Sequence, residues 1–259
     1  MRHVASVAGR ELGSLFVSPV AYGVLSLFSV LAGMFFILDL SWFEQVFQQA
    51  QQYPDQLADF NLNDGLLREF YGSISVILLF LIPGITMGVY AAEKANGTEE
   101  LLLTSPLTIW DIVLGKFAAG AIFIAVLVGI VGLFGGVLFF YGDPEIGKSA
   151  SGLIGLLLTG WTYVAIGGAA SAIARSQIVA FLITLVVLIS LLLLPGMAEF
   201  GIAGSAPGVA DTLRYLSVQL HFEPLLNGLV DTADLAYFAF MIGSFLIITK
   251  TIVESARWR

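Results

Sequence analysis

The feature that most restricts the fold of this chain is a series of long apolar blocks that are almost free of charge. Six of them can be delimited in the 259 residues, at 18–38, 71–91, 112–140, 153–174, 178–194 and 235–249. A helix that crosses about 30 Å of hydrocarbon needs roughly 20 apolar residues. Only 12% of the residues are charged, against about a quarter in soluble domains. The sequence therefore predicts one all-α domain, residues 1–259, that crosses a membrane six times.

Basic residues set the predicted orientation, because segments rich in Lys and Arg stay on the cytoplasmic side. With the N-terminus inside, the inner segments hold Arg2, Arg10, Lys94, Lys116, Arg175, Lys250, Arg257 and Arg259, and the outer segments hold Arg68, Lys148 and Arg214. An even number of crossings returns the C-terminus to the inner side. We expect a multi-pass protein with both termini in the cytoplasm.

Residues 1–17 predict an amphipathic helix at the membrane interface. Apolar side chains recur there at helical spacing on one face, and Arg10 and Glu11 can occupy the other face. Ser18-Pro19 then bends the chain into the membrane. The helix is either a flat anchor or a lever that touches a cytoplasmic partner. A signal peptide is disfavoured, because the apolar block that follows is about as long as a full span and no small-x-small cleavage site comes after it.

Two segments on the predicted outer side differ in character. The loop at 39–70 is acidic, and its apolar residues at 42–50 suggest a short helix on the membrane surface. The segment at 195–231 mixes Gly and Pro with apolar stretches that are too short to span. We therefore expect re-entrant or interfacial helices before the last crossing.

One match to a nucleotide-binding pattern needs an explanation. The run Gly142-Asp143-Pro144-Glu145-Ile146-Gly147-Lys148-Ser149 fits the phosphate-loop pattern G-x-x-x-x-G-K-S. A working phosphate loop follows a β-strand inside a nucleotide-binding domain, whereas a predicted membrane helix precedes this run. The predicted topology also places it on the outer side, where ATP is scarce. We interpret the run as a tight hairpin between the third and fourth crossings.

Other chemistries find little support in the sequence. The chain has no cysteine and two histidines, His3 and His221, without a protease or paired-histidine metal motif. We expect His221, close to Glu223, to make a polar contact in the outer segment. A net charge of −8 argues against nucleic acid as a partner. Ionisable residues occur only near the ends of the predicted spans, which argues against a proton-coupled carrier or an ion channel.

Small residues predict close contacts between helices. They are Gly132, Gly136, Gly160, Gly167, Gly168 and Ala172. Packing within one subunit and a dimer interface are both compatible with this pattern.

The cytoplasmic segment at 92–110 is the most informative part of the chain. Gly97-Thr98 can break and cap a helix, and acidic residues then stand in the favoured first turn of the next one. A leucine triplet on a cytoplasmic segment needs a cover, either the membrane interface or a groove on a partner protein. The segment's candidate contact residues are Glu93, Gly97, Thr98, Glu99, Glu100, Leu101, Leu102, Leu103, Thr104 and Pro106.

This segment resembles the coupling helix of the permease subunits of ABC-2-type transporters, which docks into the ATPase subunit. Glu99 departs from the usual apolar residue at its position. Supporting similarities point to the gliding-motility-type branch, and they lie around Arg10-Glu11-Leu12, Ser18–Tyr22, Ser176–Phe181, His221–Pro224 and Asn227–Leu235. The resemblance extends over nearly the whole chain.

The resemblance implies the architecture of a type V ABC exporter: six spans, an elbow helix carrying Arg10, Glu11 and Leu12, a coupling helix, and helical re-entry before the last span. It implies a bacterial inner (cytoplasmic) membrane location and no catalytic site, metal or cofactor in this chain. ATP and Mg would be held by a partner ABC ATPase. Further implied partners are a second permease copy or paralogue, membrane lipid, and a membrane-anchored protein with a large outer domain.

Two alternative functions remain open from the sequence. One is a membrane scaffold that transports nothing and transmits force to outer partners. The other is a membrane-embedded hydrolase, which would require His221 for turnover.

Overall fold

In a computed structural model of the protein, residues 2–51, 62–98, 107–142, 144–199 and 208–256 are described, and they form helices without a strand. Among them, six stretches are long and apolar enough to cross a membrane. These stretches are Pro19–Gln49, Asn63–Ala95, Ile109–Tyr141, Ile146–Ile173, Gln177–Met197 and Thr232–Ser255. The predicted all-α fold with six crossings is confirmed.

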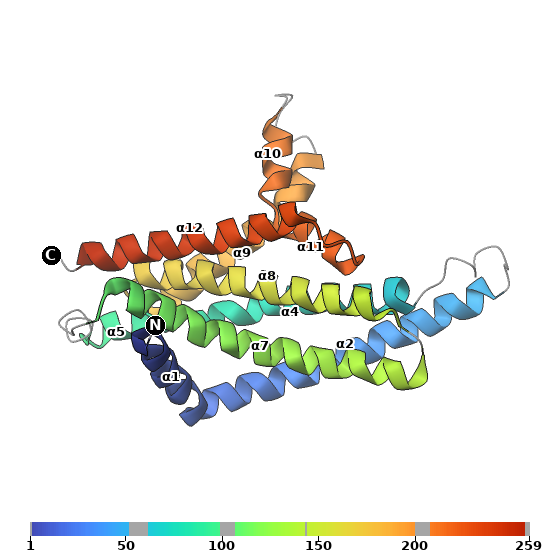
Figure 1. The fold of residues 1–259 in the computed structure, drawn as a ribbon, viewed down its shortest axis with the longest axis horizontal. Helices are drawn as coiled ribbons and strands as arrows, with labels where there is room; N and C mark the ends of the chain where they lie inside the picture. The colour runs from blue at the N-terminus through green and yellow to red at the C-terminus, as the bar shows by residue number, and fades with distance from the viewer. Residues whose placement is uncertain (1, 52–61, 99–106, 143, 200–207, 257–259) are drawn as a thin grey trace.

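The N-terminal helix α1 (Arg2–Val17) meets α2 (Pro19–Ala50) at a sharp bend (Figure 1). Ser18 forms the bend with extended backbone, and its hydroxyl accepts a hydrogen bond from the amide of Val20 at 3.3 Å. Pro19 suits the first helical position because that amide has no partner inside a helix. Helix α1 buries Val7 and Ala8 and packs against α7 (Ile109–Tyr141). It is the helix predicted at 1–17.

The first crossing continues much further than predicted. A separate surface helix was expected at 42–50, but these residues prolong α2 without a break. No proline interrupts residues 20–50. The Ser41 hydroxyl donates a hydrogen bond to the Ile37 carbonyl one turn earlier, at 2.8 Å, which is compatible with a continuous helix. A π-helical turn, η1 (Asn63–Leu67), then leads into α4 (Arg68–Thr86). Both ends of the segment at 39–70, which was expected to be a loop, are therefore helical.

The second crossing is interrupted near its end. Helix α4 contains Pro83 and ends at Thr86, and a short helix, α5 (Ala91–Ala95), follows after four turn residues. Helix α7 begins behind a capping box in which Thr108 and Asp111 each bond the other's backbone amide. The break and the start of α7 both lie beside α1, where the candidate site is found.

Helix α8 (Ile146–Ile173) is the centre of the bundle and contacts α4, α7, α9 (Gln177–Glu199), α11 (Val218–Leu226) and α12 (Thr232–Ala256). Its small residues allow this: a Cβ at Gly160 would come within 2.5 Å of Ile124, and one at Gly167 would overlap Thr86. Close packing at these two glycines is confirmed. A Cβ at Gly136 or Gly168 would meet no atom within 4 Å in this subunit, so for these two glycines a contact with a second subunit stays a prediction.

Two short helices precede the last crossing, as predicted for 195–231. Helix α11 packs against α8 and α9 and buries Phe222 and Leu225. Helix α10 (Val209–Tyr215) projects sideways from the bundle (Figure 1). The predicted fifth block ends too early, because α9 passes through Pro195 to Glu199.

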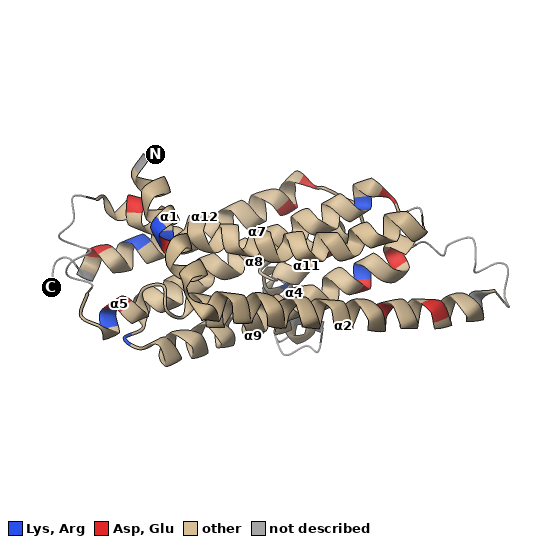
Figure 2. Ribbon diagram, turned by 90° about the horizontal axis from the view of Figure 1, so that it is seen from below, with Lys and Arg blue, Asp and Glu red and all other residues tan. Residues whose placement is uncertain are grey.

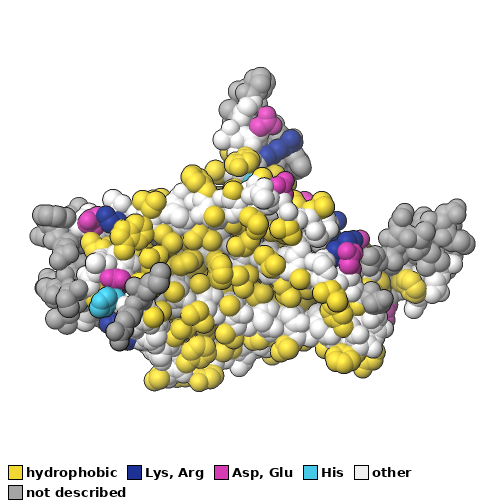
Figure 3. Space-filling view, in the orientation of Figure 1, with side chains coloured by type: hydrophobic (Ala, Val, Ile, Leu, Met, Phe, Trp, Pro, Cys, Tyr) yellow, Lys and Arg dark blue, Asp and Glu magenta, His cyan; other side chains and the backbone are white. Residues whose placement is uncertain are grey.

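The helices run roughly parallel to the long axis of the molecule, and both termini lie with α5 toward one end (Figure 1). We call this the terminal end. Charged residues gather toward the two ends of the bundle, with most of the Lys and Arg toward the terminal end (Figure 2). Hydrophobic side chains cover the face between them, and the charges on α10 stand apart (Figure 3). This distribution fits a bundle whose waist is surrounded by lipid.

Candidate functional site

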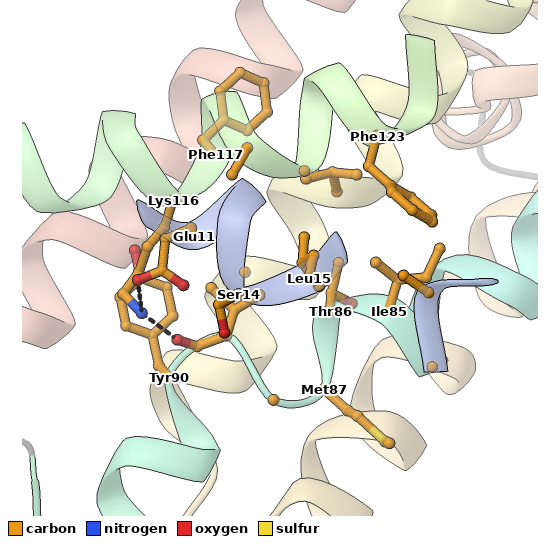
Figure 4. A pocket seen from close by; sticks show the side chains of 18 of the residues that line it. Glu11, Ser14, Leu15, Ile85, Thr86, Met87, Tyr90, Lys116, Phe117 and Phe123 are labelled. Carbon is orange, nitrogen blue, oxygen red and sulfur yellow. Dashed lines mark hydrogen bonds and ion pairs between the residues drawn. The ribbon is translucent and has the colours of Figure 1, made fainter. Parts of the chain in front are cut away.

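A buried lysine organises the terminal end of the bundle. The side chain of Lys116, on the second turn of α7, is only 3% exposed. Its Nζ donates hydrogen bonds to the Val89 carbonyl and to a Glu93 carboxylate oxygen, both at 2.7 Å. Glu11 Oε1 lies 3.4 Å away, and Nζ stands 5.2 Å from the centre of the Tyr90 ring (Figure 4). We call Lys116, Glu11, Glu93, Val89 and Tyr90 the Lys116 node.

The node joins segments that are distant in the chain. Glu11 belongs to α1 and also pairs with Arg10 at 3.0 Å, while Glu93 belongs to α5. A buried ammonium is costly unless oxygens replace its water, and here oxygens from two helices and one turn surround it. Because Lys116 keeps its place only while these oxygens do, α1, α5 and α7 are coupled in position.

The turn between α4 and α5 is held by a serine from α8. Ser171 Oγ accepts hydrogen bonds from the amides of Tyr90 and Ala91 at 3.0 and 3.1 Å, and donates one to the Met87 carbonyl at 3.0 Å. Lys94 adds a hydrogen bond from its amine to the Ala172 carbonyl. Non-helical backbone inside a membrane protein needs such partners. The break in the second crossing is therefore stabilised by specific hydrogen bonds from α8 and Lys94.

The predicted coupling residues divide into two groups. Glu93 lies in the Lys116 node, and Gly97 and Thr98 end α5. Gly97 has φ +68°, and the amide of Thr98 bonds the Glu93 carbonyl at 3.0 Å, which is the geometry of a Schellman cap. The predicted helix break at Gly97-Thr98 is thus present. The remaining residues, Glu99, Glu100, Leu101, Leu102, Leu103, Thr104 and Pro106, lie outside the described residues.

The three residues predicted for the elbow helix also differ in their contacts and burial. Glu11 reaches Lys116, Arg10 is exposed and pairs with Glu11, and Leu12 is half-buried. Sequence reasoning treated Lys116 only as a cation that fixes orientation. The signal that could have revealed it was its position eight residues into an otherwise apolar helix, where a charge is rare unless it has a partner.

The phosphate-loop match is explained by a different set of contacts. Lys148, the lysine of the pattern, already has acidic partners: its Nζ lies 3.1 Å from Asp64 and 3.8 Å from Glu145. The Asn63 side chain donates to the Glu145 carbonyl at 3.0 Å and accepts from the Glu145 amide at 2.7 Å. A helix precedes the run and another begins at Ile146. The interpretation as a hairpin between the third and fourth crossings is confirmed.

His221 makes polar contacts, as expected, although Glu223 is not its partner. Its Nδ1 lies 2.7 Å from Asp234 Oδ1, its Nε2 lies 3.0 Å from the Tyr215 carbonyl, and its ring stacks on Tyr237 with centres 3.8 Å apart. Glu223 instead pairs with Arg68 at 2.5 Å. Within the described part of the chain, no three His, Asp or Glu side chains are grouped closely enough to hold a metal ion.

The sequence model of the ABC-2 family transporter proteins matches residues 5–253, from α1 to near the end of α12. The chain belongs to this family. It is therefore the transmembrane permease component of an ABC transporter, and its family implies an ABC ATPase as partner. No curated protein matches the sequence.

Proposed function

We propose that this permease couples ATP hydrolysis by a separate ATPase subunit to export, or to other conformational work, across a bacterial inner membrane. The segment at 92–110 would dock on the ATPase, which would hold the ATP and Mg. The observation that carries this proposal is the Lys116 node, because it connects the backbone leading into that segment with α1 and α7.

The node offers a mechanical path for the coupling. Force on the coupling segment would reach Gly97-Thr98 and then α5, whose Glu93 and the preceding Val89 provide two of the oxygens at Lys116. Moving these oxygens leaves a buried ammonium without its partners, which is unfavourable. Helix α7 must then follow the displacement, and α1 follows through Glu11. The displacement would thus reach the long helices that cross the membrane.

The arrangement of charges supports the proposed orientation. Both termini and α5 lie at the terminal end (Figure 1), where most of the Lys and Arg also gather (Figure 2). Positive residues favour the cytoplasmic side, so we place this end in the cytoplasm, where an ATPase can reach it. We further propose a gliding-motility-type assembly, with a second permease copy or paralogue and a membrane-anchored partner on the outer side.

Replacement of the leucine triplet tests the docking step. The double substitution Leu101→Asp and Leu102→Asp is expected to abolish co-purification of the ATPase subunit, because each carboxylate would have to lose its water in an apolar groove. The matched control is Leu229→Asp with Val230→Asp, which changes two adjacent exposed apolar residues in the segment before α12. The control should retain the ATPase. An intact complex with the first variant would contradict docking through this segment.

Reconstituted vesicles address the nature of the work. ATP-driven substrate movement would support export. ATP-driven rearrangement of an outer partner without movement of substrate would instead support the force-transmitting alternative.

A further inference from the structure

A cavity of about 410 Å³ lies beside the Lys116 node (Figure 4). Its walls come from α1, α2, the end of α4 and α7, with smaller contributions from α8, α9 and α12. Pockets that hold small molecules have volumes of roughly 300–1,000 Å³. The cavity is thus large enough for a ligand and lies within a single subunit.

Most of the cavity wall is apolar. Leu15 projects from α1, Ala21 and Val24 from α2, and Phe117 and Phe123 from α7. Its charged groups lie at one end, where Glu11 and Lys116 meet Ser14 and Tyr90 (Figure 4). Further polar residues of the wall are Ser18, Thr86, Gln177 and Thr249. The cavity therefore has an apolar body with a polar end, which matches the shape of an amphiphile.

The broken helix contributes unpaired backbone groups to this cavity. The turn amides of Met87 and Val89 bond the carbonyls of Pro83 and Thr86, respectively. Among the described residues, however, nothing donates a hydrogen bond to the carbonyls of Gly84 and Ile85, both of which line the cavity. Gly84 is exposed and Ile85 is half-buried. A backbone carbonyl without a partner is costly inside a membrane, and irregular backbone there is typical of places that line a cavity. A ligand with a donor group would satisfy the two carbonyls.

The charges at the polar end also favour a donor over an anion. The Lys116 ammonium already donates hydrogen bonds to Val89 O and Glu93 and forms an ion pair with Glu11. An anion could bind the lysine only by displacing a carboxylate. The end of α4 adds the negative partial charge of a helix C-terminus. These charges favour a cationic or hydrogen-bond-donating head over an anion.

We propose that this cavity binds an amphiphile that has one apolar chain and a hydrogen-bond-donating head, either an ammonium or a hydroxyl group. The chain lies among Leu15, Val24, Phe117 and Phe123. The head lies at the Gly84 and Ile85 carbonyls. Binding needs only the permease subunit, so its failure would leave the coupling proposal untouched.

Two photo-crosslinking probes test the head-group preference. They are a long-chain alkylamine and the matching alkanoic acid, each with the same diazirine in the chain. The full-length permease in nanodiscs is irradiated with each probe, and labelled peptides are mapped by mass spectrometry. We expect the amine to label peptides containing Leu15 or Phe117 about tenfold more than the acid does. Equal labelling by both probes, or labelling by neither, would overturn the proposal.

A pair of glycine substitutions tests the location. A Cβ at Gly84, which lines the cavity, would meet nothing within 4 Å, so Gly84→Leu is expected to place its side chain in the cavity. Gly129 on α7 is equally unobstructed but lies outside the cavity, which makes Gly129→Leu the matched control. Gly84→Leu should lower amine labelling about tenfold, while Gly129→Leu should leave it unchanged. Undiminished labelling of a Gly84→Leu protein would contradict the assignment.

Folding of each variant is checked by its elution profile and thermal unfolding. If Gly84→Leu fails to fold, Gly168→Leu reaches the same cavity from α8, also without a nearby atom. Competition identifies the source of the natural ligand. Displacement of the probe by diacylglycerol in the nanodisc indicates a membrane lipid, whereas displacement only by an unlabelled long-chain amine added from solution indicates a free amphiphile.

Discussion

Two buried polar clusters hold this permease together, and they differ in how much water can reach them. In the Lys116 node the carboxylates of Glu11 and Glu93 remain 25% and 24% exposed. In the second cluster, the His221 node (His221, Asp234, Tyr215 and Tyr237), the imidazole and carboxylate are 10% and 11% exposed. The carboxylates of the first node therefore keep part of their water, whereas its lysine does not. The second can break only by leaving a charge or a polar group buried.

The His221 node also allows little variation in its hydrogen bonds. The Tyr215 carbonyl can only accept, so Nε2 must carry a hydrogen. The other nitrogen and the Asp234 carboxyl then share one further proton between them. Tyr237 completes the cluster by donating to the Leu216 carbonyl at 2.8 Å. We infer that this node fixes α10 and α11 to α12, while the Lys116 node makes α1, α5 and α7 move together.

The largest expected effect follows from breaking the His221 node on one side. His221→Leu leaves the Asp234 carboxylate buried and unpaired, which should lower the free energy of unfolding by about 3–5 kcal/mol. Denaturant unfolding in detergent micelles measures this change. The double variant His221→Leu and Asp234→Leu should recover most of the loss, because neither polar partner remains. If His221→Leu is as stable as the unaltered protein, the proposed difference between the two nodes is contradicted.

At the Lys116 node we expect a smaller loss of stability but a larger loss of coupling between ATP hydrolysis and rearrangement of the permease. Lys116→Met should lower the free energy of unfolding by about 1–3 kcal/mol, since Val89 loses a buried donor while both carboxylates can rehydrate. ATP hydrolysis by the assembled complex should then no longer drive rearrangement of the permease. Both quantities are measured on the same reconstituted complex.

The control for this prediction is Lys250→Met, which carries the same substitution near the same end of the bundle. Lys250 pairs with Glu254 one turn along α12 and is more exposed than Lys116. It should leave both stability and coupling nearly unchanged. If the two lysine variants behave alike, burial at Lys116 has no special role.

The crossings could be predicted from the sequence, because each depends on local hydrophobicity over about 20 residues. The nodes could not, because they join residues far apart in the chain. Lys116 meets Glu93 across 23 positions, and Glu11 is contributed by a different helix. The cavity was equally hidden, since it arises where α4 breaks after Pro83 and Gly84 beside the bend between α1 and α2. The apolar residues at 42–50 predicted a separate surface helix, but no helix breaker separates them from the first crossing, so they prolong α2.

The smallest expected effect concerns an ion pair on the surface beside the His221 node. Arg68 on α4 pairs with Glu223 on α11, and their side chains are 36% and 48% exposed. Arg68→Ala should cost at most about 1 kcal/mol in the free energy of unfolding, because water already solvates both groups.

A double-mutant cycle with Glu223→Gln, repeated at low and high salt, isolates this pair, and its coupling should weaken as salt screens the charges. A coupling energy that is large and insensitive to salt would mean that α11 is fastened through Arg68. The His221 node would then not be the main polar attachment of α11. A small, salt-sensitive value, together with a large loss in His221→Leu, would place that attachment in the buried imidazole and carboxylate, where water does not enter.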